Sequence, residues 1–161
     1  MLEFFVIILS FTGLILQSSY FDYFSLLGVK PDIVLVCVVF YAVFNGPVKG
    51  GIIGAVVGLI EDLFMGQYIG PMLILRLLTG GGVGYFSRNF YKESILIPMA
   101  VLFAVTFMSN TLLWIFNSLM KNYISWMYLI NVSLLQGAYN MIFMPIFYLI
   151  KRKVLLRENR G

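Results

Sequence analysis

The sequence is most informative at Gly46-Pro47-Val48-Lys49-Gly50-Gly51-Ile52-Ile53-Gly54-Ala55-Val56-Val57-Gly58. Glycines recur there every four residues, at Gly46, Gly50, Gly54 and Gly58, so on a helix they would share one face. A face without side chains lets two helices approach closely, and such ridges are typical of helix contacts within membranes. The pattern therefore predicts a helix-packing ridge. Packing inside the chain is the simpler interpretation, and docking of a partner helix is the alternative.

The composition of the whole chain is typical of a membrane protein. Of its 161 residues, 61 % are hydrophobic and 11 % are charged, and the mean hydropathy is +0.95. Soluble domains contain about 45–50 % apolar and about 25 % charged residues. A soluble fold of this size could not bury so much apolar surface, and disorder requires low hydrophobicity. The composition therefore excludes a soluble enzyme and a disordered chain.

Apolar runs and the breaks between them predict an all-α membrane protein with a single six-helix transmembrane bundle. Because a spanning helix uses about 20 residues, six of them leave no room for a soluble domain. We expect one polytopic membrane domain over residues 1–161, ending in a basic cytoplasmic tail over 151–161. The expected spans cover residues 2–19, 32–45, 48–65, 70–89, 94–120 and 127–151.

The basic residues predict the orientation of the chain in the membrane. The tail carries five of them, and the positive-inside rule places such a tail in the cytoplasm. Six spans then place the N-terminus in the cytoplasm as well. The basic residues expected on the inner side are Lys49, Arg88, Lys92, Lys151, Arg152, Lys153, Arg157 and Arg160. The net charge of +4 therefore needs no nucleic acid, and we expect Lys151, Arg152 and Lys153 to contact lipid headgroups or a cytoplasmic partner.

The residues that the chain lacks limit its chemistry. Histidine is absent, and Cys37 is the only cysteine. A zinc site built from cysteine and histidine and a Ser-His-Asp triad are both impossible in a single such chain. The sequence thus predicts no catalytic residue, no metal and no cofactor.

Three charged residues fall within expected spans. Glu61 and Asp62 lie near the end of the third span, and Arg76 lies in the fourth. At 1.5 Å per residue their depths below the connecting turn are similar, about 5 Å for Asp62 and about 9 Å for Arg76. An ion pair between Arg76 and either carboxylate is therefore expected. Its role is open between a staple of the hairpin, a contact to a partner or ligand, and a proton relay. Because Asp62 continues the glycine ridge, we expect Asp62→Ala to weaken assembly more than Glu61→Ala.

The last two expected spans carry polar stripes, which fit internal hydrogen bonding between helices or, alternatively, a polar ligand cavity. The residues of the stripes are Thr106, Asn110 and Asn117 on one span and Ser133, Gln136, Gly137 and Asn140 on the other.

The segment from about Pro31 to Tyr85 resembles the rod shape-determining protein MreD family, and the six expected spans and basic tail are similar as well. The resemblance rests on Lys30-Pro31-Asp32, Phe40-Tyr41-Ala42, Asn45-Gly46-Pro47, the run from Gly50 to Leu63, and Gly66 and Gly70. Within it, Asp62 occupies the acidic position of the family's Gly-x-x-x-Asp pattern.

The resemblance implies a non-enzymatic integral membrane scaffold of the bacterial cell-wall elongation machinery in the cytoplasmic (inner) membrane. Such proteins associate with the bitopic protein MreC and, through it, with RodA, a class B penicillin-binding protein and MreB. It also implies a fold similar to the S components of vitamin importers. A vitamin-binding S-component-like subunit is therefore the alternative function, and a membrane enzyme using Glu61, Asp62 and Arg76 is a third.

Overall fold

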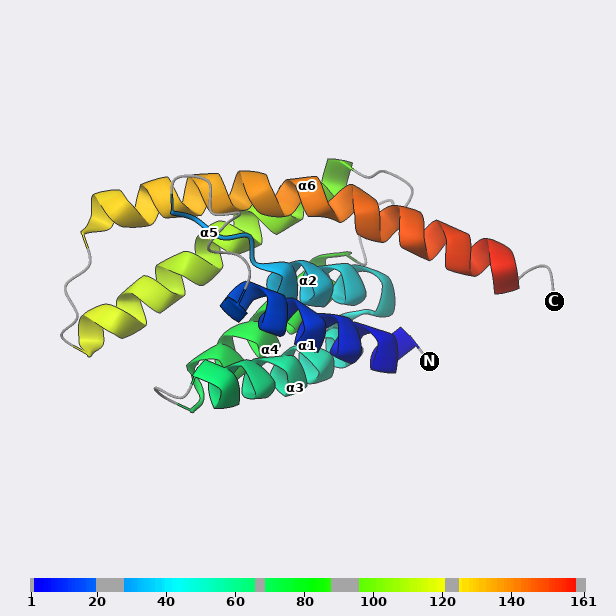
Figure 1. The fold of residues 1–161 in the computed structure, drawn as a ribbon, viewed down its shortest axis with the longest axis horizontal. Coiled ribbons are helices and arrows are strands. Elements are labelled where there is room, and N and C mark those ends of the chain that lie inside the picture. Colours follow the sequence, from blue (N-terminus) through cyan, green and yellow to red (C-terminus); the bar gives the residue numbers. More distant parts are fainter. Residues whose placement is uncertain (1, 20–27, 66–68, 88–95, 121–124, 159–161) are drawn as a thin grey trace.

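The computed structural model describes residues 2–19, 28–65, 69–87, 96–120 and 125–158, and this part of the chain contains six helices (Figure 1). The helices are α1 (Leu2–Ser19), α2 (Ile33–Asn45), α3 (Pro47–Met65), α4 (Pro71–Phe86), α5 (Leu96–Leu119) and α6 (Trp126–Glu158). The all-helical fold class expected from the sequence is thus confirmed, and most helix ends lie within two or three residues of the expected ones.

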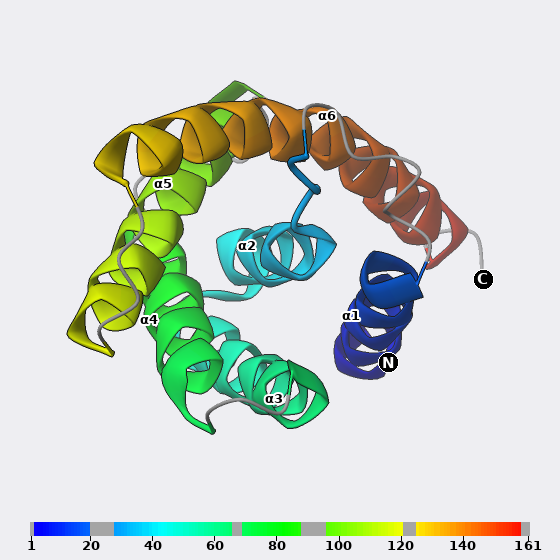
Figure 2. The ribbon, with the colours of Figure 1, turned by 60° about the vertical axis from the view of Figure 1, so that its left-hand side comes forward.

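Helix α2 occupies the centre of the fold. Figure 2 shows α1, α3, α4, α5 and α6 arranged around it, and α2 contacts all five. Every residue from Val34 to Val43 is buried, as expected for a helix that is apolar on all sides. With 13 residues it is about 20 Å long, which is shorter than the hydrocarbon core of about 30 Å. Helix α2 is therefore the core helix of the bundle, and the other five helices separate most of it from the surroundings.

The glycine ridge of α3 lies against α4. A methyl group on Gly50 would lie 2.6 Å from the carbonyl oxygen of Gly80, and methyl groups on Gly54 and Gly58 would overlap the backbone of Arg76 and Met72. The backbones of the two helices are therefore in direct contact, which only glycine permits at these positions. Because α4 covers this face, the face has no room for a partner helix.

Gly46 differs from the other three glycines of the pattern. It lies between α2 and α3, with φ at +85°, and its N–H donates to the carbonyl oxygen of Ala42 at 3.0 Å. A positive φ is rarely adopted by residues with a side chain, and glycine allows it without steric cost. The helical part of the ridge therefore begins at Gly50, although the backbone of Gly46 still packs closely against Gly84.

Helix α6 is longer than expected. It contains 33 residues and continues to Glu158, whereas the expected span ended at residue 151. The segment from 151 to 158, expected to be a separate tail, is a continuation of the helix in the structure. Lys151, Arg152 and Lys153 therefore lie on this helix, but their side chains lie outside the described part.

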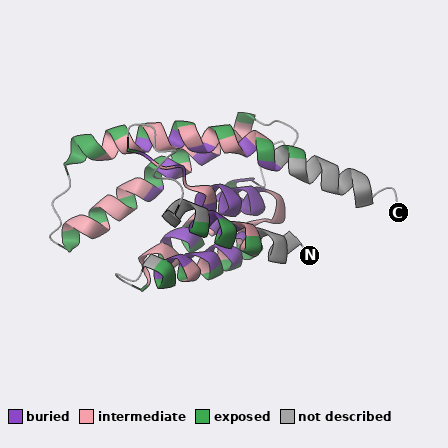
Figure 3. Cartoon of the chain, viewed as in Figure 1, coloured by how far each residue is buried: buried purple, intermediate pink, exposed green. Residues whose placement is uncertain are grey.

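Much of the outer surface is apolar. Figure 3 shows exposed residues along the outward faces of α3, α5 and α6, while α2 is buried. Large apolar side chains such as Val48, Leu63, Ile74 and Ile142 are more than half exposed, which is unusual for a soluble monomer. Two described helical segments, Leu96–Leu119 and Trp126–Phe147, are long and apolar enough to cross a bilayer.

Candidate functional site: a buried ion network between helices

Arg76 of α4 forms a two-pronged ion pair with Glu61 of α3. Its Nε donates to Oε2 of Glu61 at 2.8 Å, and its Nη2 donates to Oε1 at 2.8 Å. Both side chains are only 2 % exposed. This fork geometry is the strongest form of an arginine–carboxylate contact. Of the two carboxylates considered from the sequence, the one paired with Arg76 in the structure is Glu61.

Asp32 is the third member of the network. Nη2 of Arg76 also donates to Oδ1 and Oδ2 of Asp32, at 3.0 and 2.8 Å. The same Oδ1 accepts the backbone N–H of Leu35 at 2.8 Å, so Asp32 caps α2 as well. Its side chain is 15 % exposed. One guanidinium therefore joins α4 to α3 and to the start of the central helix.

Asp62 has a different role from Glu61. Its carboxylate accepts three backbone N–H groups from the start of α4, from Gly70 at 2.8 Å, Met72 at 3.0 Å and Leu73 at 3.0 Å. The first N–H groups of a helix have no partner within it, and Gly70 has no side chain that could accept them. Asp62 of α3 therefore caps α4 from a neighbouring helix, where its negative charge also favours the helix dipole.

The network continues to α5 and α6 through Asn140. Oδ1 of Asn140 accepts the N–H of Asp32 at 2.8 Å, and its Nδ2 donates to Oγ1 of Thr106 at 3.0 Å. One helical turn away on both helices, the side chain of Asn110 donates to Gln136 at 2.8 Å. Gln136 in turn donates to the carbonyl oxygen of Lys30 at 2.9 Å. Most described members of the polar stripes thus form hydrogen bonds within the chain. Asn117 bonds the backbone of its own helix instead, to Leu113 at 2.9 Å.

The arrangement is suited to holding helices together. A single buried cation faces two carboxylates, and both oxygens of Glu61 are occupied by Arg76. Buried ion pairs of this kind cost desolvation and are balanced only when their hydrogen bonds are well made. In the described part of the chain, no group of three potential metal ligands occurs. The observed contacts of Arg76, Glu61 and Asp32 hold α2, α3 and α4 together by charge and hydrogen bonding.

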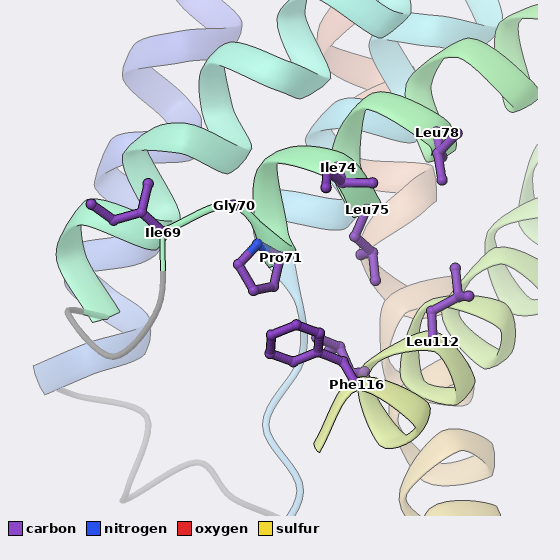
Figure 4. Close-up of a pocket in the computed structure, with 9 residues that line it drawn as sticks. Ile69, Gly70, Pro71, Ile74, Leu75, Leu78, Leu112 and Phe116 are labelled. Atoms are coloured by element: carbon purple, nitrogen blue, oxygen red, sulfur yellow. The ribbon is translucent and has the colours of Figure 1, made fainter. Parts of the chain in front are cut away.

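An apolar groove lies between the start of α4 and the end of α5. Figure 4 shows Pro71, Ile74 and Leu75 of α4 facing Leu112 and Phe116 of α5. The groove has a volume of about 400 Å³, and nine residues line it. All nine lining residues are apolar or glycine, so the groove offers no polar side chain to a ligand.

Asp62→Ala is expected to lower the free energy of unfolding by about 2 kcal/mol, because it removes the cap of α4. Glu61→Ala is expected to cost more, about 3–5 kcal/mol, because it leaves Arg76 buried with a single partner. The expected order of the two variants in stability is therefore the opposite of the order that the glycine ridge predicts for assembly. Thermal unfolding of the two purified variants in the same detergent measures the difference, and a lower melting temperature for Asp62→Ala would contradict it.

The exposed apolar surface and two helices long and apolar enough to cross a bilayer are typical of a helical membrane protein. The family model described as rod shape-determining protein MreD matches residues 1–154. The chain therefore belongs to the MreD family, a family of membrane proteins, and has a role in determining rod shape. Comparisons with curated proteins and with solved structures give no match. The expected likeness to the S-component fold accordingly stays a prediction.

Proposed function

We propose that this MreD-family chain is a non-enzymatic scaffold of the cell-wall elongation machinery in the bacterial cytoplasmic membrane. It binds an MreC-like bitopic protein. Through that protein it associates with RodA, a class B penicillin-binding protein and MreB, and it supports peptidoglycan synthesis. The observation that carries the proposal is the family match over residues 1–154.

The organisation of the charged groups supports a scaffold. Glu61, Arg76 and Asp32 bind one another, and Asp62 binds the backbone of α4. These groups fix how α2, α3 and α4 sit together, and α2 also contacts α1, α5 and α6. A rigid helical body of this kind is suited to presenting constant helix faces to a spanning partner, since association in lipid depends on close packing.

The same proposal includes a single polytopic membrane domain with six spans and both termini in the cytoplasm. Support comes from the position of the chain ends: the start of α1 and the end of α6 lie toward the same end of the molecule (Figure 1). The basic residues of segment 151–157 lie at that end, in agreement with the positive-inside rule.

Co-purification from native membranes tests the proposal. The affinity-tagged chain is expected to recover an MreC-like protein in near-stoichiometric amount, and depletion of the chain is expected to turn rods into spheres. The control is a tagged, unrelated six-span protein expressed at the same level. Normal rods after complete depletion, or recovery of no MreC-like protein from a well-folded preparation, would refute the scaffold role.

A further inference from the structure

The last turns of α6 extend beyond the rest of the bundle. The helix has 33 residues, which corresponds to about 50 Å at 1.5 Å per residue. The hydrocarbon core of a bilayer is only about 30 Å thick. Figure 1 shows the end of α6 projecting past the start of α1. A substantial part of α6 must therefore lie outside the hydrocarbon.

The distribution of charge along α6 identifies that part. From Trp126 to Ile150 the helix contains no charged residue, and this segment is about 37 Å long. Such a length crosses the hydrocarbon core with a moderate tilt. The basic residues Lys151, Arg152, Lys153 and Arg157 all follow Ile150; we call these four residues the basic collar. The collar therefore emerges directly into the headgroup layer.

The helical register spreads the basic collar around the axis of α6. Each residue turns a helix by about 100°, so Lys151, Arg152 and Lys153 fall on three different sides. The apolar residues Val154, Leu155 and Leu156 fall between the basic positions. A helix that lies flat on a membrane needs one polar and one apolar face, and this segment has neither. The order of residues in this segment therefore fits a helix that passes steeply through the headgroup layer better than one that lies along it.

We propose that the basic collar binds the headgroups of anionic phospholipids around the emerging end of α6. The negative charge of such lipids lies at the depth where the helix leaves the hydrocarbon, and each basic residue near an anionic surface strengthens binding by up to about fivefold. The proposal rests on the membrane placement of α6 proposed above, and it is independent of which protein partner the chain binds.

Spin-labelled lipids test this inference on the full chain. The purified protein is reconstituted into phosphatidylcholine vesicles that contain a trace of labelled phosphatidylglycerol or labelled phosphatidylcholine, and the protein-bound fraction of each is measured. We expect severalfold preference for phosphatidylglycerol. The preference is expected to weaken at 1 M salt, where the Debye length falls to about 3 Å.

Two variants separate charge from fold. Lys151→Gln/Arg152→Gln/Lys153→Gln/Arg157→Gln is expected to reduce the preference to a ratio near one. Lys151→Arg/Arg152→Lys/Lys153→Arg/Arg157→Lys is expected to keep it. An unchanged preference after neutralisation would overturn the proposal, as would equal association of both lipids with the unmodified chain. The co-purification experiment described above is repeated with both variants. If neutralisation abolishes recovery of a protein partner but leaves the lipid preference unchanged, the collar binds an acidic protein and the proposal is overturned. Failure of the scaffold proposal is a separate result, in which neither variant recovers an MreC-like protein.

Discussion

Arg76→Met is expected to lower the free energy of unfolding by about 3–5 kcal/mol, because it leaves two carboxylates without their shared cation. Glu61 is 2 % exposed and has both oxygens bound to Arg76, so it cannot recover its hydration without opening the fold. Natural proteins are stable by only about 5–15 kcal/mol. The variant is therefore expected to melt far below the unmodified chain and to be recovered in low yield.

A double variant distinguishes lost charge balance from lost packing. Glu61→Leu/Arg76→Met removes both buried charges, and replacing a buried ion pair by apolar side chains is often neutral. Asp32 remains, but it is 15 % exposed and keeps its hydrogen bond to the N–H of Leu35. We expect the double variant to recover at least half of the stability lost in Arg76→Met. The cycle consists of the unmodified chain, Glu61→Leu, Arg76→Met and the double variant. Their stabilities, measured by thermal unfolding in one detergent, give the coupling energy between the two side chains.

The same cycle decides between a structural and a partner-contacting role for the ion network. If Glu61 and Arg76 act through the fold alone, the double variant should support rod shape about as well as its stability allows. A double variant that is stable, reaches the membrane and still fails to support rod shape would show that the ion pair itself contacts a partner. A single Arg76→Met variant as stable as the unmodified chain would contradict the structural interpretation.

The sequence predicts the helices well because their signal is local. Apolar runs broken by glycine, proline and charge locate six helices. The similar depth of Asp62 and Arg76 on a hairpin predicts an ion pair, but it leaves open whether Asp62 or Glu61 is the partner. The sequence does not predict Asp32 as a member of the network, because Asp32 is 44 positions from Arg76. It reaches Arg76 only because α2 lies at the centre of the fold. The sequence does contain one indication that α2 lies at the centre of the fold. A helix that is apolar on every side from Val34 to Val43 is typical of a core helix.

The end of α6 shows a second limit of hydropathy. The hydropathy pattern predicts that the sixth span and its helix both end near Lys151, where the charged residues begin. Lysine, arginine and leucine are nevertheless good helix formers, and proline and glycine are absent from 151 to 158. Helix propensity therefore favours continuation of the helix, whereas the hydropathy pattern predicts only the extent of its apolar part.

Gly54→Ala is the substitution expected to damage the glycine ridge most. Its methyl group would overlap the carbonyl group of Arg76, and backbone atoms cannot rotate away as a side chain can. Overpacking commonly costs about 1–3 kcal/mol and occasionally more. We expect the upper end of that range or beyond, because α4 must move as a body. That movement would also stretch the ion pair between Arg76 and Glu61.

Gly82→Ala is the matched control, since a methyl group there meets no atom within 4 Å. The same chemical change within α4 should leave stability unchanged or raise it by up to about 1 kcal/mol, because alanine favours a helix more than glycine does. We therefore expect Gly54→Ala to lower the melting temperature strongly, and Gly82→Ala to leave it unchanged or raise it slightly. If Gly54→Ala and Gly82→Ala destabilise the chain equally, the glycines contribute only backbone flexibility. Close contact between α3 and α4 would then not explain why the glycines of α3 recur every four residues.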